Sequence, residues 1–435
     1  MKKNRTIYFL LALVCLGLQS CLFQEEDYFD DSSANRATAD VKRCSELLEA
    51  APNGWVMEYY VGKDYSLGGI TLLCKFDGQR VTMASQIAGA DETVSSLYSV
   101  KSEQATMLSF DTYNYLVHYF GQPQGSMADD PNGTLGGDYE FVISDATADR
   151  IELKGKKYGN RIVMKAFSAD QTWKQYLTRI KKVEDDAFFY EYDLRMDGLY
   201  TGQMLRSNYT FIVTYYDEVG KVYQKTVPFM FTTDGMRFHE PVTIDGQTMQ
   251  NFVWKNEEIS FVCTDEGATG VKMKGIYIDG YQSYDYYPGT YLMDFYRLNG
   301  ATNQLEVASQ EIQLVKNEDG KSYWLKGLEY DILVTYDKPR GGLSILPQFL
   351  KKVQGGYVYL AMWDLMNDYV LRSSAIGLIS YPTTDGIYLV DNGVWMGEIS
   401  GFIFGVYDSQ DEEASFMGYT DAVAAIRLIK KTIEE

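Results

Sequence analysis

WVMEYY, at residues 55–60, is the stretch where the hydrophobic pattern of the chain changes its period. Before it, apolar residues between positions 41 and 48 recur at helical spacing, and a Pro-Asn-Gly turn at 52–54 ends that run. Two aspartates and two serines at 30–33 supply the groups that cap a helix start. From Trp55 onward the period is two, which is typical of β-strands. The sequence therefore predicts one helix followed by strands.

Short strand candidates follow, separated by turns of Gly, Asp and Asn, as in a β-meander. In the first half they lie at residues 70–76, 80–84, 94–100, 107–110, 139–143, 150–153 and 161–164. Residues 113–120 fit either a short helix or a further strand. Ser168-Ala169-Asp170 predicts the start of an amphipathic helix that runs through Ile180. We place a domain boundary at Asp185-Asp186.

The second half repeats the order of strands followed by a helix. Its strand candidates are residues 209–216, 221–231, 236–238, 242–244, 258–263, 275–278, 290–297, 325–335, 343–346, 357–363 and 387–390. In residues 421–433, apolar side chains at Val423, Ile426, Ile429 and Ile433 fall on one helix face, together with Lys430. This spacing predicts a terminal helix.

The composition supports a β-rich fold. The chain contains 36 Tyr and 21 Phe but only 9 Pro, and aromatic side chains suit a pleated, half-buried surface. We therefore predict a mainly β protein with two antiparallel barrel-like or sandwich-like units and a few peripheral helices. The units are expected at residues 32–186, with the N-terminal helix, and at residues 187–435, with the terminal helix.

The N-terminal residues resemble a bacterial lipoprotein signal. Three cations at positions 2, 3 and 5 precede an apolar stretch at 7–18, and Ser20 precedes Cys21 at the expected cleavage point. The apolar stretch is shorter than the about 20 residues of a spanning helix, which disfavours the alternative of a transmembrane anchor. The resemblance implies a signal peptide at 1–20, acylation of Cys21 and attachment of the mature chain to the outer membrane through lipid.

The acidic cluster at residues 24–27 is similar to the surface-export signal of lipoproteins from Bacteroidota, and implies an outer-membrane protein on the cell surface. The alternative is that residues 21–31 are only a solvated acidic tether. Loss of the three signal cations lowers the net charge from −20 to −23. Such a charge makes nucleic acid a poor partner.

Several short motifs resemble an uncharacterised lipoprotein family of Bacteroidota, domain of unknown function 4302. They are Gly54-Trp55, Gly68-Gly69 and residues 108–114, 137–141 and 153–157, with weaker similarity at 233–235 and 346–348. The resemblance covers most of the N-terminal half. It implies an outer-membrane or surface lipoprotein associated with nutrient-uptake loci, and it implies no catalytic residues.

The residues that commonly carry catalysis or bind metals are sparse. His118 and His239 are the two histidines, no Gly-x-Ser-x-Gly motif is present, and we expect both histidines to be structural. The acidic loop at 129–134, with Asp138, offers oxygen ligands but departs from the calcium-loop pattern, which favours a solvated turn. We predict no catalytic residue, metal or cofactor. A carboxylate-dependent hydrolase stays an alternative, because 60 acidic residues always offer candidate pairs.

Three cysteines remain once the signal is removed and Cys21 is acylated. They are Cys44, Cys74 and Cys263, and their spacing matches no metal site. An odd number allows at most one disulfide, so at least one thiol is expected to be a small buried side chain.

The densest unusual feature is the tyrosine-rich segment at residues 277–291. Tyrosine combines a broad apolar face with a polar tip, which suits the recognition of sugars or peptides. The predicted ligand-binding residues are Tyr281, Tyr284, Asp285, Tyr286 and Tyr287. The alternative is that these rings pack within the strands.

Together these features predict a non-enzymatic surface lipoprotein that binds a glycan, a peptide or another nutrient, beside an outer-membrane transporter. A hydrolase and a structural or adhesive surface protein are the alternatives.

Overall fold

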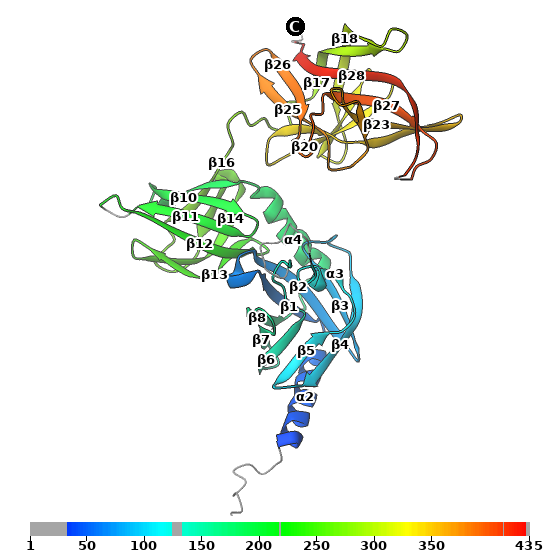
Figure 1. The fold of residues 1–435 in the computed structure, drawn as a ribbon. Coiled ribbons are helices and arrows are strands. Elements are labelled where there is room, and N and C mark those ends of the chain that lie inside the picture. Colours follow the sequence, from blue (N-terminus) through cyan, green and yellow to red (C-terminus); the bar gives the residue numbers. More distant parts are fainter. Residues whose placement is uncertain (1–32, 124–132, 217–218, 412, 432–435) are drawn as a thin grey trace, which may run out of the picture.

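The computed structural model of the protein describes residues 33–123, 133–216, 219–411 and 413–431. The predicted signal, the lipidation site Cys21, the tether and most of the acidic loop at 129–134 lie outside these ranges. The described residues form three antiparallel β units, which follow one another along the chain (Figure 1). The prediction of a mainly β fold with few helices is confirmed.

The first unit is a closed barrel in which each strand pairs with the next and β8 pairs back with β1. Its strands are β1 (Trp55–Val61), β2 (Gly68–Asp77), β3 (Arg80–Ser85), β4 (Val94–Ser102), β5 (Thr106–Phe110), β6 (Glu140–Ala146), β7 (Arg150–Gly155) and β8 (Arg161–Ala166). The alternation in β1 sets the barrel wall, because Trp55, Met57 and Tyr59 are fully buried in its core. Glu58 and Tyr60, between and after them, belong to the outer side of the wall.

Two helices and a short 3₁₀ turn accompany this barrel. Helix α2 (Ser33–Ala50) is tied to β1, since the Trp55 indole donates a hydrogen bond to the Leu48 carbonyl at 2.8 Å. The 3₁₀ turn η2 (Lys63–Tyr65) follows β1. Residues 113–120, whose sequence fits either a helix or a strand, contain the short helix α3 (Tyr115–His118), and Asn114 caps it.

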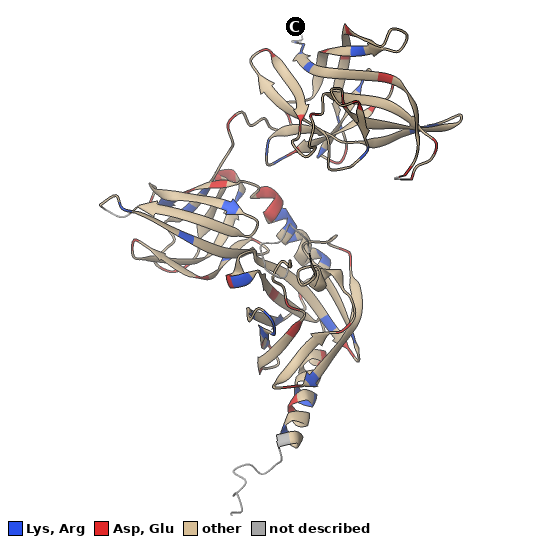
Figure 2. Ribbon diagram, in the orientation of Figure 1, with Lys and Arg blue, Asp and Glu red and all other residues tan. Residues whose placement is uncertain are grey.

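Helix α4 (Trp173–Asp186) joins the units. Thr172 and Gln175 form a capping box, so the helix starts slightly later than the predicted cap at Ser168-Ala169-Asp170. In Figure 2, Lys and Arg line the body of α4, and acidic residues follow at its end. The Lys181 ammonium donates to two carbonyls of the first unit, and the Asp185 carboxylate pairs with Lys338 of the third at 3.1 Å.

The second unit is also a closed barrel, in which β9 pairs with both β10 and β16. Its strands are β9 (Glu191–Met196), β10 (Leu199–Ser207), β11 (Thr210–Tyr216), β12 (Val222–Phe231), β13 (Gly235–Ile244), β14 (Gln247–Lys255), β15 (Ser260–Cys263) and β16 (Val271–Ile276), with the 3₁₀ turn η4 (Asn256–Glu258) before β15. The first two barrels touch closely. A Cβ on Gly68, whose φ is +73°, would lie 1.9 Å from the Tyr209 carbonyl oxygen, and the Tyr209 ring packs against both cores.

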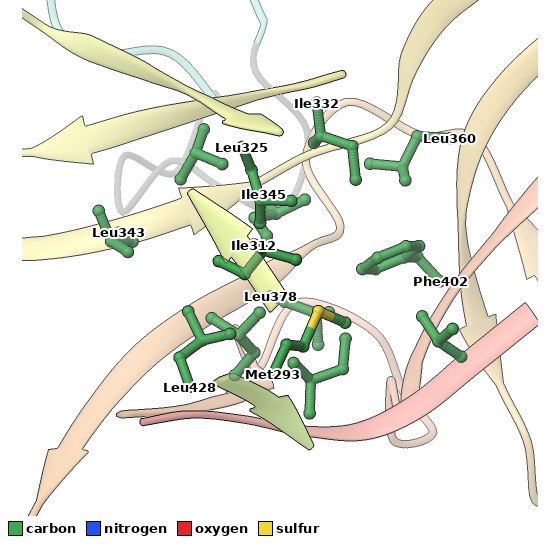
Figure 3. Packing of buried hydrophobic residues seen from close by; sticks show 14 of the residues in the cluster. Met293, Ile312, Leu325, Ile332, Leu343, Ile345, Leu360, Leu378, Phe402 and Leu428 are labelled. Atoms are coloured by element: carbon green, nitrogen blue, oxygen red, sulfur yellow. The ribbon is translucent and has the colours of Figure 1, made fainter. Parts of the chain in front are cut away.

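The third unit is a single sheet that closes on itself and then extends beyond the ring. The ring runs through β17 (Gly289–Asn299), β18 (Gln304–Lys316), β19 (Ser322–Lys326), β20 (Ile332–Asp337), β21 (Gly342–Ile345), β25 (Leu378–Thr383), β26 (Gly386–Asp391) and β28 (Phe416–Lys430). The extension beyond β28 holds β27 (Gly401–Tyr407), β23 (Gly356–Asp364), β22 (Gln348–Val353) and β24 (Tyr369–Leu371). Figure 3 shows side chains from both parts meeting in one core, among them Met293, Leu378 and Phe402.

The number of units and the terminal element differ from the predictions. The stretch expected to form one unit, residues 187–435, contains two sheets that share no strand pairing. Residues 416–430 form strand β28, so the predicted terminal helix at 421–433 is wrong over its described part. The reason is a bulge at Ala425, which has a φ of 50° and is exposed, while Val423, Ile426 and Leu428 all enter the barrel core. The bulge adds one residue to the period of two and so imitates helical spacing.

The three cysteines of the folded region, Cys44, Cys74 and Cys263, are free and buried. Each behaves as a small core side chain, and burial raises the pKa of the Cys263 thiol to about 11. Across the described parts of the chain, no helix combines the length and apolar character needed to cross a bilayer.

Candidate functional site

The tyrosine-rich loop packs against the third barrel beside β19, β20 and Gly341. Tyr287 is fully buried, and its hydroxyl donates to the Gly341 carbonyl at 2.8 Å. Tyr284 is half-buried and stacks on Tyr323 with a centroid separation of 4.7 Å. Tyr281 packs beside Phe188, so it lies where the third unit meets the end of α4. Packing therefore accounts for these three tyrosines.

Two members of the loop stay on the surface. The Asp285 carboxylate pairs with Lys316, and the exposed ring of Tyr286 lies under the Lys430 ammonium, 4.9 Å from it. A ligand role for these two residues stays a prediction.

The two histidines belong to different units, and both have aromatic surroundings. The His118 Nδ1 atom accepts a hydrogen bond from the Asn114 amide, and its ring stacks on Tyr139 at 4.7 Å. His239 lies in the second barrel between Tyr60 and Tyr65. Within the described residues, no group of three or more His, Cys, Asp or Glu side chains is placed to hold a metal ion.

The extension of the third unit carries a groove of 710 Å³ that is lined by aromatic rings. Four rings form one row across β22, β23, β27 and β28: Phe349, Tyr359, Tyr407 and Phe416. Consecutive centroids are separated by 5.4, 5.7 and 5.5 Å. This volume falls within the range of about 300–1,000 Å³ of small-molecule sites. We take this aromatic groove as the candidate site.

Strand register builds the row. Phe349 lies directly opposite Tyr359, and Tyr407 lies opposite Phe416, so each pair is a cross-strand contact. Gly405 lies opposite Tyr359 and leaves room for the rings, because a Cβ there would lie 2.9 Å from the Tyr407 ring and 3.1 Å from the Phe416 ring. The glycine thus leaves the space that the edges of these two rings occupy.

Arg372 covers the middle of the row. Its guanidinium carbon lies 4.8 Å from the centroid of Tyr359 and 4.2 Å from that of Tyr407, in cation–π geometry. One guanidinium N–H donates to the Asp411 carbonyl at 2.6 Å. Burial raises the pKa of Tyr407, against the opposing effect of the Arg372 charge, so its hydroxyl stays protonated at neutral pH.

The two ends of the row are open. Phe349 and Phe416 are each 45% exposed, whereas Tyr359 is half-buried and Tyr407 is buried. Polar groups of Ser373, Ser374 and Gln410 line the groove beside these rings. The groove therefore combines apolar faces with hydrogen-bonding groups, which is the combination that a ligand with both kinds of surface requires.

No local cluster of residues in the sequence predicts this groove. Its aromatic residues come from strands between positions 348 and 430, and strand pairing alone brings them together. The one available signal was the alternation of Tyr357 and Tyr359 within the predicted strand at 357–363. That strand is confirmed as β23, but its register with β22 and β27 depends on long-range pairing.

Comparison with known proteins places the chain among uncharacterised families. A family model described as "Domain of unknown function (DUF4302)" matches residues 25–256, and a second one, DUF4987, also described as a domain of unknown function, matches residues 264–403. None of the curated proteins matches the chain. Among solved structures, a protein of unknown function from the DUF3598 family of Nostoc punctiforme aligns at 7% identity with a TM-score of 0.15, covering 57% of this chain and 99% of its own.

Proposed function

Because the chain belongs to the family of the domain of unknown function DUF4302, whose description assigns no activity, we propose from the aromatic groove that this protein binds a glycan. The observation that carries the proposal is the row from Phe349 to Phe416 with Arg372 over its middle. A pyranose ring has an apolar face of C–H groups and a rim of hydroxyls. The aromatic faces suit the first, and the polar lining suits the second.

The charge of the groove favours a neutral glycan. Arg372 and Asp411 are the charged residues among the described residues that line it, one of each sign. The whole chain carries a net charge of −20, which repels acidic polymers at long range. A peptide is the runner-up ligand, since aromatic rings also bind apolar side chains, but the polar lining suits a ligand rich in hydroxyls.

The groove favours binding over hydrolysis. Most glycosidases place two carboxyl groups on either side of the bond that they cleave. Among the described residues that line the groove, Asp411 supplies the one carboxylate. A second carboxylate would be needed for the hydrolase alternative.

The expected test is a glycan array probed with the full-length protein and with a Phe349→Ala/Phe416→Ala variant. Both rings are exposed at the ends of the row, so their loss should change the free energy of unfolding by no more than about 0.5 kcal/mol each. Binding to any selected glycan should fall roughly tenfold or more, as expected for anchoring aromatic residues.

Tyr381→Ala is the matched control, because this tyrosine is 62% exposed on β25 of the same unit and does not line the groove. Its array signal should equal that of the wild type. The proposal fails if no glycan is bound, or if the control and the double variant bind equally well.

The proposed location follows from the N-terminal residues. A lipid on Cys21 would hold the protein at the outer membrane, and residues 21–31 would form an acidic tether. The groove would then bind nutrients at the cell surface, beside a transporter. Palmitate labelling in the native host is expected to mark the wild type and not Cys21→Ala. Label that persists in the variant would remove the lipid anchor from the account.

A further inference from the structure

A polar cavity of 200 Å³ lies where the first and second barrels meet. Strands β1, β7 and β8 form one wall, and β13 of the second barrel forms the other. In Figure 1, β13 lies next to the first barrel, and β2 and β12 contact each other beside it. This cavity belongs to different units from the aromatic groove and does not depend on it.

The cavity has an excess of positive charge. Among the described residues that line it, the cations are Arg150, Arg161, Lys165 and Arg237. Two carboxylates balance them in part. Glu58 pairs with Lys165 at 2.7 Å and with Arg237, while Glu152 pairs with Arg161 at 2.9 Å and with Arg150 at 3.1 Å. Four cations against two carboxylates leave two positive charges, in a chain whose net charge is −20.

The hydroxyl of Tyr60 is the second observation that points to a ligand. Tyr60 lines the cavity and is 97% buried, since its exposed fraction is 3%. Burial raises the pKa of its phenol, and the nearby charges of Arg237 and Glu58 act on it in opposite directions. The Arg237 guanidinium lies close enough to interact with this hydroxyl, yet the hydroxyl makes no hydrogen bond of normal geometry with any described residue. A buried donor of this kind requires a partner, which native proteins nearly always supply.

His239 completes the wall beside this hydroxyl. Its ring lies 4.3 Å from the centroid of Tyr60 and 4.0 Å from that of Tyr65, so it is held by aromatic contacts on both. Burial lowers the pKa of His239, and the ring is therefore neutral at pH 7. A neutral imidazole carries one N–H donor. The cavity wall therefore combines hydrogen-bond donors with a net positive charge.

We infer that this cavity, between β1, β8 and β13, binds a small oxyanion group through Arg161, Lys165, Arg237 and the Tyr60 hydroxyl. A volume of 200 Å³ corresponds to roughly six or seven water molecules in the liquid. It admits a phosphate, a sulfate or the carboxylate end of a sugar acid, and it is too small to enclose a whole oligosaccharide. The planar fork of a guanidinium group can donate two parallel N–H hydrogen bonds to a pair of oxygens on such an oxyanion.

The test is isothermal titration calorimetry of the full-length protein with three probes, added separately in a chloride buffer: inorganic phosphate, inorganic sulfate and glucuronate. At least one probe should bind with one-to-one stoichiometry. Preference for phosphate or sulfate would identify a tetrahedral oxyanion, and preference for glucuronate would identify a sugar carboxylate. Arg161→Gln and Tyr60→Phe should each weaken binding at least tenfold.

Tyr60→Phe keeps the aromatic contact with His239 and removes only the hydroxyl, so its melting temperature without anion should equal or exceed that of the wild type. Lys326→Gln is the charge-matched control, because this exposed lysine belongs to the third unit and pairs only loosely, at 3.8 Å, with Asp331. Its affinity for the probe should be unchanged. The inference is overturned if none of the three probes binds, or if binding is the same in Arg161→Gln, Tyr60→Phe and the wild type.

Discussion

Tyr287→Ala is expected to lower the free energy of unfolding of the third unit by about 3 to 5 kcal/mol. The Tyr287 ring is fully buried, its hydroxyl bonds to the Gly341 carbonyl, and it packs edge-on against Tyr323 at 6.1 Å. Alanine would leave a cavity at the end of the barrel core and a carbonyl without its partner. Urea unfolding, followed through the transition of the third unit, measures the change.

Tyr286→Ala is the matched control one position earlier. Its ring is 38% exposed and contacts Lys430 from the surface, so its loss should change stability by about 0.5 kcal/mol or less. Equal destabilisation by the two substitutions would contradict the assignment of Tyr287 to the core and Tyr286 to the surface. Comparing the stabilities of the Tyr287→Ala and Tyr286→Ala variants therefore distinguishes a core tyrosine from a surface tyrosine within one loop.

Glu58→Ala is expected to destabilise the contact between the first two barrels by about 3 kcal/mol. The Glu58 side chain is 13% exposed and balances both Arg237 and Lys165. Removing it would leave the guanidinium of Arg237, which is 24% exposed, without its carboxylate. Differential scanning calorimetry measures the loss. Asp331→Ala, which breaks an exposed pair with Lys326, should change stability by no more than about 0.5 kcal/mol.

The contribution of Glu58 should also depend on pH. Burial raises the pKa of this carboxyl, but the charges and hydrogen bonds of Arg237 and Lys165 lower it by a larger amount. The pKa of Glu58 therefore lies below the usual 4.5. A carboxyl whose pKa is lowered by folding stabilises the protein above its unfolded pKa. The stabilisation is then lost as the pH falls through the folded value. Between pH 6 and pH 3 the Glu58→Ala variant should therefore lose less stability than the wild type, and an equal loss would contradict the ion-pair assignment.

Local patterns were sufficient to predict the fold class. The period of two that begins at residues 55–60 corresponds to the wall of the first barrel, where Trp55, Met57 and Tyr59 face the core. The first helix and α4 were also predicted, because amphipathic spacing and caps are properties of neighbouring residues. Such signals act over a few positions and are visible in one sequence.

Long-range pairing explains what local patterns missed. The bulge at Ala425 made β28 look like a helix, because it moved Ile426 onto the face of Val423. The closure of a third ring depends on pairing between β17 and β28, whose partners are more than 120 positions apart. The aromatic groove follows from the register of four strands, so Phe349 and Phe416 meet Tyr359 and Tyr407 only after folding.

The tyrosine-rich loop shows the opposite case, a dense local cluster that contains core residues as well as surface residues. Tyr287 and Tyr291 are fully buried, and the Tyr291 hydroxyl donates to the Tyr287 carbonyl at 2.7 Å. Tyrosine fills a barrel end well because its ring packs and its hydroxyl satisfies turn carbonyls. Density of aromatic residues in sequence therefore does not distinguish a binding surface from the closure of a core.

Hydrogen–deuterium exchange with and without a glycan selected on the array tests the glycan-binding claim most directly. The account predicts slower exchange of backbone amides in β22 (Gln348–Val353), in the segment around Arg372 and in β27 (Gly401–Tyr407), which surround the aromatic groove. The amides of β1 and β8 in the first barrel should exchange as before. Protection confined to other units, or no protection at saturating glycan, would contradict the assignment of the groove as the binding site.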